Sequence, residues 1–580
     1  MINGNKLKTK INQIVKEDLK QDFNIEDDKQ EKNKTFVASE LGARRMASLR
    51  SVISNKELWV CYIGLFLITF VNSLESNFNY SLFNIALEEF KANAILSVFG
   101  VVTSLLGIIL VPLYSKFTDY FGRTEIYLFS LLCHLLGVVF LGVANSFSFF
   151  FAGYFLSNIG FIGFNITKKI IVADLTSLAN RAMFSSIDMI PFVLNNWLGT
   201  LLATPVSVNL GWRWGYIVSA AIFIPCISLF FGMMFYLQRK AKKQTNTFVS
   251  IKQFGLSTGL KNIYQELDLV GFTLLVAGLL TLLIPFNIAA TLENGWGSPS
   301  MIALIIIGVV LLIGLIVWES KYAKAPLIPL SIFKNRTVSG AILVICLISL
   351  DSGINWQYLY LYFMTSRKLD PTSASLLFKG YQTGYLISAL ITGFLIKKLH
   401  NYKYLLIAGA ALNCIGLGAM IPARFPHSSD LSIHVTQALS GIGQGIVDIG
   451  IAVAYQGSVD RKDIAITVST IQIIQGIVSA FGNTIAGVVW VQVVPMLIKQ
   501  RVEGEIDMTG AMNQMKYVWE LPSNQFDQVI SSYGDVQMIF SALSCALAGL
   551  ALVIIIFMIN PVNVHTTQKF DGKITEKHED

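Results

Sequence analysis

Four acidic residues interrupt long apolar stretches of this sequence: Glu75, Asp188, Asp351 and Asp448. A charge at the centre of a bilayer costs at least ~2.5–3.5 kcal/mol on insertion scales, so an ionisable side chain there faces a cavity or a partner. A carboxyl group shielded from water can hold a proton and release it when its surroundings change. The four residues are therefore candidates for proton binding inside a membrane.

Polar and aromatic residues follow two of these acids. Glu75 and Asn79 are four residues apart, as are Asp351 and Asn355, so each pair shares one face of a helix. Such faces can line a cavity that binds a bulky solute. The side chains that we predict to contact this solute are Asn79, Tyr80, Asn195, Asn355, Trp356, Tyr358, Tyr381 and Tyr385.

Each assignment has a structural alternative. Glu75 falls in the outer half of its apolar segment and can lie in a wet vestibule. Asp188 can pair with Arg181, and the glycines before Asp448 can serve helix packing. A single tyrosine inside a membrane can equally be a hydrogen-bonded core residue.

The segments that position these residues are long enough to cross a membrane. Of the 580 residues, 53% are hydrophobic and only 14% are charged, whereas soluble proteins contain about 25% charged residues. A spanning helix needs about 20 apolar residues. We therefore predict an all-α membrane protein with fourteen transmembrane helices at about 58–80, 94–115, 125–144, 147–167, 184–206, 215–237, 267–290, 300–319, 338–363, 374–396, 403–423, 432–456, 466–491 and 538–559.

Loop charges predict the orientation. If the first helix starts in the cytoplasm, the inner loops carry twenty Lys and Arg residues and the outer loops carry nine. This bias follows the positive-inside rule and places both termini in the cytoplasm. The net charge of +8 then comes from these loops, and we expect no nucleic-acid partner.

The polar ends and the longest loop complete the predicted organisation. Residues 1–57 contain no apolar core of a signal peptide and are predicted to form a disordered cytosolic tail. Residues 560–580 form a second cytosolic tail. The outer loop 492–537 is amphipathic in places, which leaves open a surface helix or a solvated connector.

Several chemistries find no support in the sequence. The six cysteines all fall in apolar segments without a CxxC pattern, and the histidines are scattered, so we expect no disulfide framework and no metal site. No phosphate-binding loop of the Gly-rich Lys-Ser/Thr type is present, so we expect no ATP-driven step. No nucleophile and base pair suggests an enzyme, and we expect no cofactor.

The loop after the second predicted helix carries a motif. It reads SKFTDYFGRTE over residues 115–125, where Gly122 permits a tight turn, Asp119 can cap a helix start or pair with a base, and Arg123 supplies a cation. This resembles the Gly-x-x-x-Asp-Arg-x-Gly-Arg-Arg signature of the major facilitator superfamily, with three departures at Ser115, Tyr120 and Thr124. The resemblance implies a gating loop formed by Asp119, Gly122, Arg123 and Glu125.

Further stretches resemble the fungal siderophore-iron transporters. They are ADLTSL at 173–178, NNWLG at 195–199, GWRWGY at 211–216, WE at 318–319 with APLIP at 325–329, and YGDVQ at 533–537. The resemblance implies a six-helix half at 58–238, a cytoplasmic loop at 239–266, two added helices at 267–320 and a second half at 338–559. It also implies a substrate site at the midplane and rocking of one half against the other.

The same resemblance implies a function. Such transporters take up Fe(III) chelates with the proton gradient, so the expected partners are a ferric siderophore, protons and lipid. We expect a monomer in the plasma membrane or in an endosomal or vacuolar membrane.

Two other functions stay open. A proton antiporter that exports glutathione, drugs or another organic solute would keep the fold. Exporters with fourteen helices usually carry Gly-x-x-x-Gly-Pro on the fifth helix, and here residues 189–199 read MIPFVLNNWLG without it. A non-transporting receptor would need signalling tails, but the tails of about 57 and 20 residues show no folded domain.

Overall fold

The structure is a computed structural model. It describes residues 45–46, 49, 52–175, 190–202, 205–206, 209–244, 268–288, 298–323, 333–399, 402–459, 464–502, 504–560, 567–570 and 573–576. Helices dominate these residues, as the apolar segments predict. The helices are α4 (Asn55–Glu89), the short η1 (Asn93–Ile95), α5 (Leu96–Phe121), α6 (Arg123–Gly142), α7 (Phe147–Leu175), α9 (Ile190–Leu201), α11 (Trp212–Gln244), α13 (Leu269–Ile288), α14 (Pro299–Lys321), α15 (Arg336–Asn355), α16 (Leu359–Ser366), α17 (Pro371–Leu399), α18 (Lys403–Ala423), α19 (Asp430–Gly457), α20 (Ile464–Arg501), α21 (Met508–Asn513), α22 (Met515–Glu520) and α23 (Ser523–Met558). Two short strands, β1 (Thr567–Phe570) and β2 (Lys573–Glu576), pair antiparallel near the C-terminus.

Twelve stretches of the described residues are helical, long and apolar enough to cross a membrane, and they coincide with twelve of the fourteen predicted spans. The fifth predicted span is represented by α9, of which 12 residues are described. The tenth coincides with α17, which has 29 residues but carries several polar side chains. The all-helical membrane fold is thus confirmed, and the count of fourteen stays a prediction.

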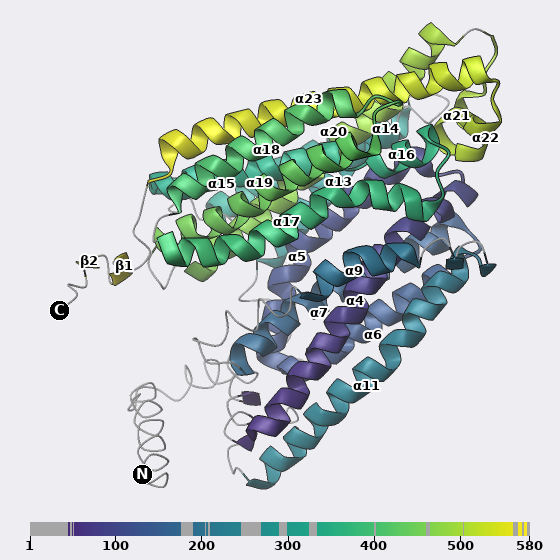
Figure 1. Cartoon of the computed structure of the whole chain (residues 1–580). Coiled ribbons are helices and arrows are strands. Elements are labelled where there is room, and N and C mark those ends of the chain that lie inside the picture. Colours follow the sequence, from purple (N-terminus) through teal and green to yellow (C-terminus); the bar gives the residue numbers. More distant parts are fainter. Residues whose placement is uncertain are drawn as a thin grey trace.

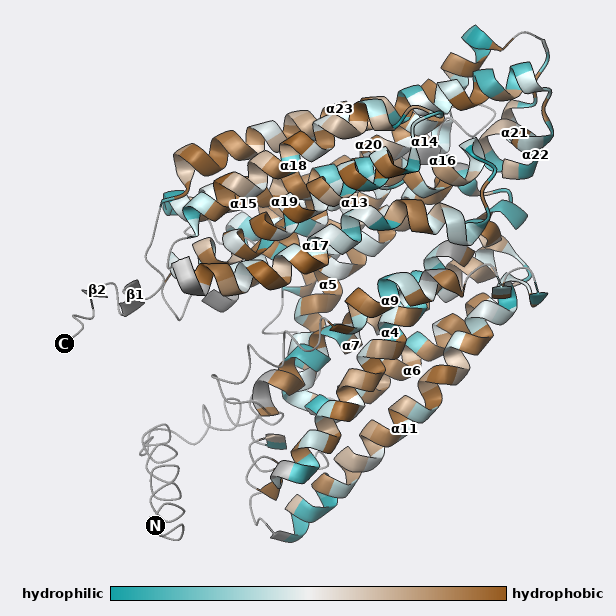
Figure 2. Cartoon of the chain, viewed as in Figure 1, coloured by the Kyte–Doolittle hydropathy of each residue, from teal (hydrophilic) through white to brown (hydrophobic). Residues whose placement is uncertain are grey.

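Hydrophobic residues predominate along the long helices (Figure 2), and many large apolar side chains are exposed. Ile316, Phe394 and Leu431 are about 70% exposed. Soluble proteins rarely leave such extended apolar surface in water. A lipid environment explains it, because hydrocarbon chains take the place of a protein core.

The helices form two groups (Figure 1). The first group contains α4, α6, α7, α9 and α11, and the second contains α15 to α20 and α23. Helix α5 lies between them, since it packs on both α7 and α20. Helices α13 and α14 pack on each other, and α13 also contacts α5 and α20 through an apolar cluster. This is where the added helix pair is predicted.

The two groups meet where α4 ends and diverge towards the end where α4 begins (Figure 1). Hydrogen bonds join the two sides, among them those from Lys379 Nζ to Asn77 Oδ1 at 2.6 Å, from Asn196 Nδ2 to Thr383 Oγ1 at 3.0 Å, from Asn93 Nδ2 to the Asn513 carbonyl at 3.1 Å and from the Lys516 amide to Glu88 Oε1 at 3.0 Å. With the predicted orientation, this conformation is closed towards the outside.

The ninth predicted span, 338–363, is interrupted. Helix α15 starts after Asn335, whose side chain caps two backbone amides, and ends at Asn355. Helix α16 begins only at Leu359. Irregular backbone at membrane depth is tolerated where it is buried in protein or lines a cavity. Trp356 and Gln357 at this break do line a cavity.

The long outer loop, predicted at 492–537, is mostly helical. Helix α20 continues to Arg501, α23 starts at Ser523, and α21 and α22 fill the space between. Val518 is buried, and the Trp519 indole donates to the Thr365 carbonyl at 3.0 Å. A solvated connector is therefore the wrong alternative, because the apolar residues of this loop pack on the second group.

The predicted disordered tail, 1–57, also ends earlier than expected. Met46 and Leu49 are buried against the first group, and Arg45 forms an ion pair with Glu125 at 3.0 Å. Helix α4 then begins with a capping box between Ser54 and Glu57. Two apolar residues in a polar segment are enough to hold it on the bundle.

Candidate functional site

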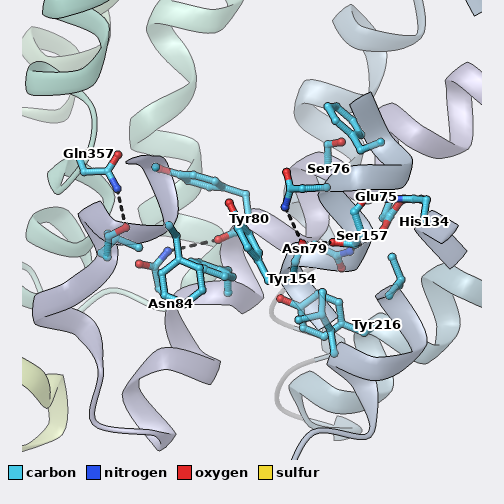
Figure 3. A pocket seen from close by; sticks show the side chains of 18 of the residues that line it. Glu75, Ser76, Asn79, Tyr80, Asn84, His134, Tyr154, Ser157, Tyr216 and Gln357 are labelled. Atoms are coloured by element: carbon cyan, nitrogen blue, oxygen red, sulfur yellow. Dashed lines mark hydrogen bonds and ion pairs between the residues drawn. The ribbon is translucent and has the colours of Figure 1, made fainter. Parts of the chain in front are cut away.

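A cavity of about 500 Å³ lies beside α4, α5, α6, α7 and α11, and the second group closes it with Trp356, Gln357 and Phe378 (Figure 3). We call it the larger cavity. Of the predicted residues, Glu75, Asn79, Tyr80 and Trp356 line it. Ligand sites typically enclose about 300–1,000 Å³ and combine apolar walls with a few polar groups. The larger cavity fits this description.

In the larger cavity, Glu75 is hydrogen-bonded to His134. Its Oε2 lies 2.9 Å from His134 Nε2, and its Oε1 accepts from Asn79 Nδ2 at 3.1 Å. His134 Nδ1 lies 3.0 Å from the Ser157 carbonyl oxygen. Glu75 and His134 are 5% and 6% exposed. The carboxyl is therefore held from two sides, away from bulk water.

These hydrogen bonds place a proton in the pair. A carbonyl oxygen can only accept, so His134 Nδ1 carries a hydrogen. The 2.9 Å contact between Nε2 and Glu75 then needs one hydrogen between the two atoms. It belongs to a neutral Glu75 carboxyl or to a His134 imidazolium. In both forms the pair holds one proton more than an ionised Glu75 beside a neutral His134.

Two glycines bring His134 to this position. A Cβ at Gly160 of α7 would lie 2.2 Å from the His134 backbone nitrogen, and one at Gly137 of α6 would lie 2.2 Å from that of Ser157. Small residues let membrane helices approach closely. Because α6 and α7 touch backbone to backbone, the His134 ring reaches the Ser157 carbonyl and turns its other nitrogen to α4.

No local sequence signal points to His134. It lies 59 residues from Glu75, and the scattered spacing of the histidines predicts only that no metal site is present. The small-residue spacing of Gly153, Gly160 and Gly163 on α7 was the available hint, since it indicates a close helix contact.

A second, smaller cavity of about 230 Å³ lies in the second group, between α15, α17, α19 and α20. Asp351, Asp448, Tyr381 and Tyr385 line it, so the structure brings four predicted residues together. The two tyrosine rings stack at 6.2 Å and 18°. A Cβ at Gly441 would lie 2.1 Å from the Tyr381 carbonyl, which confirms the packing role of that glycine.

Other predicted residues lie outside both cavities. Asn195 donates to Ser73 Oγ at 2.6 Å and ties α9 to α4. Asn355 accepts from Arg424 at 2.9 Å, and Tyr358 stacks on Trp490 at 4.6 Å. These side chains hold helices together, so their predicted contact with substrate gains no support. Asp188 lies outside the described residues.

The predicted gating loop forms a compact turn. Arg123 pairs with Asp119 at 2.5 Å and also donates to Thr118 at 2.9 Å. Asp119 lies in the last turn of α5 and caps no helix, which corrects one of its two predicted roles. Gly122 has φ +102°, which a residue with a side chain rarely adopts. Glu125 forms an ion pair with Arg45 at 3.0 Å.

Comparison with known proteins places the chain in a family. The sequence matches the family model of the Major Facilitator Superfamily over residues 65–350 and 341–494. The chain belongs to the major facilitator superfamily. It is accordingly a multi-pass membrane transporter, and the resemblance predicted from the loop motif is confirmed.

Curated members of the superfamily that the chain resembles come from fungi. A siderophore iron transporter of Emericella nidulans is 29% identical over 78% of this chain and 76% of its own length. A siderochrome iron transporter of Aspergillus fumigatus is 28% identical over 79% and 76%. Siderophore iron transporter 1 of Schizosaccharomyces pombe is 25% identical over 90% and 85%. The resemblance to this group is thus confirmed across most of the chain.

Solved structures of major facilitator proteins show the same fold. A bacterial homologue of the lysosomal transporter Spinster, inward-facing and occupied, aligns with a TM-score of 0.52 at 14% identity, over 87% of this chain and 97% of that one. An auto-inhibited peptide transporter of the POT family aligns at 0.56 and 13%, over 88% and 98%. At these identities the likeness concerns the fold alone.

Proposed function

We propose that this chain is a proton-coupled importer of ferric siderophores, with the chelate in the larger cavity and the proton on the Glu75–His134 pair. The proposal on substrate is supported by the relatives, whose names all concern siderophore or siderochrome iron. The single observation that carries the proposal on coupling is the buried 2.9 Å contact between Glu75 and His134.

The lining of the larger cavity favours a neutral chelate. Among its lining residues, Glu75 and His134 are the acid and the base, and none is Lys or Arg. Asn79, Tyr80 and Gln357 offer hydrogen-bonding groups, and Phe83 and Phe99 offer apolar walls. A ferric complex with three negative charges would meet no cation there and would lose its hydration. A ferric trihydroxamate carries no net charge and avoids that cost.

The proton is coupled to conformation through the Glu75–His134 contact. With the proton bound, the pair has no net charge and needs no further partner in the membrane. Without it, the neutral His134 ring has one N–H and can donate to only one of its two partners, Glu75 or the Ser157 carbonyl. Loss of the proton therefore weakens the contact of His134 with α4 or with α7, and either change alters the wall of the larger cavity.

Transport requires the closed end to open. The bonds from Lys379, Asn93 and Lys516 across the two groups must break when the outer side opens. Each is a single hydrogen bond, and such bonds contribute about 0.5–1.5 kcal/mol net between neutral groups and about 1.5–3 kcal/mol where one group is charged. A small set of this kind can form and break in a rocking cycle.

The test is uptake in cells that lack other siderophore transporters. Cells expressing the chain receive radiolabelled neutral ferric trihydroxamate with and without an uncoupler. We expect accumulation that the uncoupler abolishes, and loss of accumulation in Glu75→Gln and in His134→Asn at normal surface abundance. Glu505→Gln, an exposed carboxyl outside both cavities, is the matched control.

Two results would overturn the proposal. Uptake that is unchanged by the uncoupler would contradict the proposed proton coupling. Absence of uptake for every chelate tested would contradict the proposed substrate. Export of a preloaded organic solute driven by an inward proton gradient would support the antiporter instead.

A further inference from the structure

We propose that the smaller cavity, lined by Asp351, Asp448, Tyr381 and Tyr385, binds an organic ammonium group. This site is separate from the Glu75–His134 pair. The binding itself does not depend on the proposed function, whereas its consequence for the choice of chelate does.

The two carboxyl groups of the smaller cavity have no cationic partner. Among the described residues, neither forms an ion pair within 4.0 Å, and no Lys or Arg lines this cavity. Arg424 donates to Gln537 at 2.6 Å and to Asn355 at 2.9 Å, and it forms no ion pair within 4.0 Å with either acid. Two acids thus share a small space without the counter-charge that buried acids usually have.

Asp351 has an unused acceptor. The side chain is only 8% exposed, and its Oδ1 has no hydrogen bond. The buried Ser349 Oγ in the same cavity also has no partner. Buried polar atoms are nearly always paired, so unpaired ones need an explanation. A ligand that donates several hydrogens would pair both of them.

Asp448 is held in place by a directed chain of side chains. Ser440 donates to Asn413 at 2.7 Å, Asn413 donates to Gln444 at 3.0 Å, and Gln444 donates to Asp448 Oδ1 at 2.8 Å. Every amide in this chain therefore points its donor towards the carboxyl. Tyr385 lines the cavity together with this carboxyl. Such a network fixes an acceptor, and the two oxygens of a carboxylate have lone pairs left for a further donor in the cavity.

The aromatic walls suit a positive charge. Tyr381 and Tyr385 stack on one another, and Trp356 packs on Tyr381 with ring centroids 4.3 Å apart. The faces of aromatic rings attract ammonium groups, and desolvation strengthens this attraction. Two carboxyls, unpaired acceptors and aromatic faces together describe a site for an ammonium with a short alkyl stem.

The smaller cavity adjoins the larger one. Ser352 lines both, and Trp356 of the larger cavity packs on Tyr381 of the smaller. A chelate in the larger cavity could therefore extend an ammonium arm into the smaller cavity. On the proposed function, this predicts a preference for chelates with a free primary ammonium.

Ligand binding to the purified full-length chain in detergent tests the proposal. The probe is n-butylammonium, and its N-acetylated form, N-butylacetamide, is the neutral match. With five heavy atoms, n-butylammonium should bind with a Kd on the order of 1 mM. We expect millimolar n-butylammonium to raise the thermal unfolding midpoint of the wild type and of Asp527→Asn, an exposed aspartate on α23. We expect no shift in Asp351→Asn or Asp448→Asn, and none from N-butylacetamide.

Several outcomes would overturn the proposal: no shift in the wild type, an equal shift from N-butylacetamide or from sodium chloride, or a shift that persists in the double aspartate variant. If the aspartate variants do not fold, Tyr385→Leu keeps both carboxyls and removes one ring face. Binding to Tyr385→Leu should weaken at least threefold, and unchanged binding would exclude the site. Because these measurements use no chelate, a failure of siderophore uptake would not change their outcome.

Discussion

The carboxyl groups of the two cavities differ in their partners. In the larger cavity, Glu75 is paired with His134 at 2.9 Å and held by Asn79. In the smaller cavity, Asp351 and Asp448 line the same space, and neither forms an ion pair with a described residue. Because His134 lies beside Glu75, a single proton satisfies the hydrogen bond between them and leaves the pair without net charge. The smaller cavity is complete only when something from outside supplies donors and charge.

The difference arises from helix packing. Helices α6 and α7 touch through Gly137 and Gly160, which delivers a basic ring to α4. Helices α17 and α19 touch through Gly441, which delivers the tyrosines. Close packing thus serves both halves, but it presents a base in one and aromatic rings in the other.

The largest effect is expected from a change that separates α6 from α7. In Gly160→Ala the new Cβ would lie 2.2 Å from the His134 backbone, which requires a backbone shift. Overpacking of this kind costs about 1–3 kcal/mol, so we expect a clearly lower unfolding midpoint and loss of uptake. Gly314→Ala, where nothing lies within 4 Å, is the control and should behave as wild type. Equal midpoints for both variants would show that the close contact is unimportant.

The next effect concerns the pair as a unit. We expect Glu75→Gln and His134→Asn each to lower proton-driven uptake at least tenfold, because either one removes the shared proton. The double variant should be no worse than the single ones, since residues that act together are not additive. The measurement is the initial rate of uptake at equal surface abundance. If the fold-losses of the two single variants multiply in the double variant, the two residues act independently.

A smaller effect should separate the two cavities by substrate. Asp448→Asn should lower uptake of a linear ferric trihydroxamate ending in a primary ammonium several-fold and leave its N-acetylated form unchanged. The reason is that Asp448 faces the smaller cavity, away from the neutral chelate core. Competition between the two chelates in one assay measures the ratio directly. An equal loss for both would assign Asp448 to the common transport step.

The sequence predicted one of these cavities better than the other. Helical spacing placed Asn79 beside Glu75, and the hydrogen bond at 3.1 Å confirms it. The same spacing placed Asn355 beside Asp351, but the helix ends at Asn355 and its side chain turns to Arg424. His134 could not be predicted, because only tertiary packing brings it to Glu75. Local periodicity therefore finds neighbours within a helix and fails at helix breaks and between helices.

Apolar length predicted the helices but not their ends. Because α20 and α23 extend beyond a bilayer's thickness, the predicted outer loop 492–537 is mostly helix. The continuation of α20 over residues 492–498 is itself mostly apolar, whereas the first turns of α23 are largely polar and contact α22.

The smallest effect is expected from an acid outside both cavities, which contrasts with the buried ones. Arg213, with Trp212, holds the pKa of Glu89 below its usual value at the closed end. A lowered carboxyl pKa stabilises the fold above the unfolded value of about 4.3, and this stabilisation is lost as the pH falls through the lower folded value. Because the Glu89 side chain is 47% exposed, solvent screening limits the contribution to under about 1 kcal/mol. Glu89→Gln should therefore unfold slightly earlier than wild type at pH 7, and the difference should shrink in thermal unfolding scans as the pH falls below the unfolded value. A difference that does not change with pH would show that packing, and not the charge, makes Glu89 stabilising.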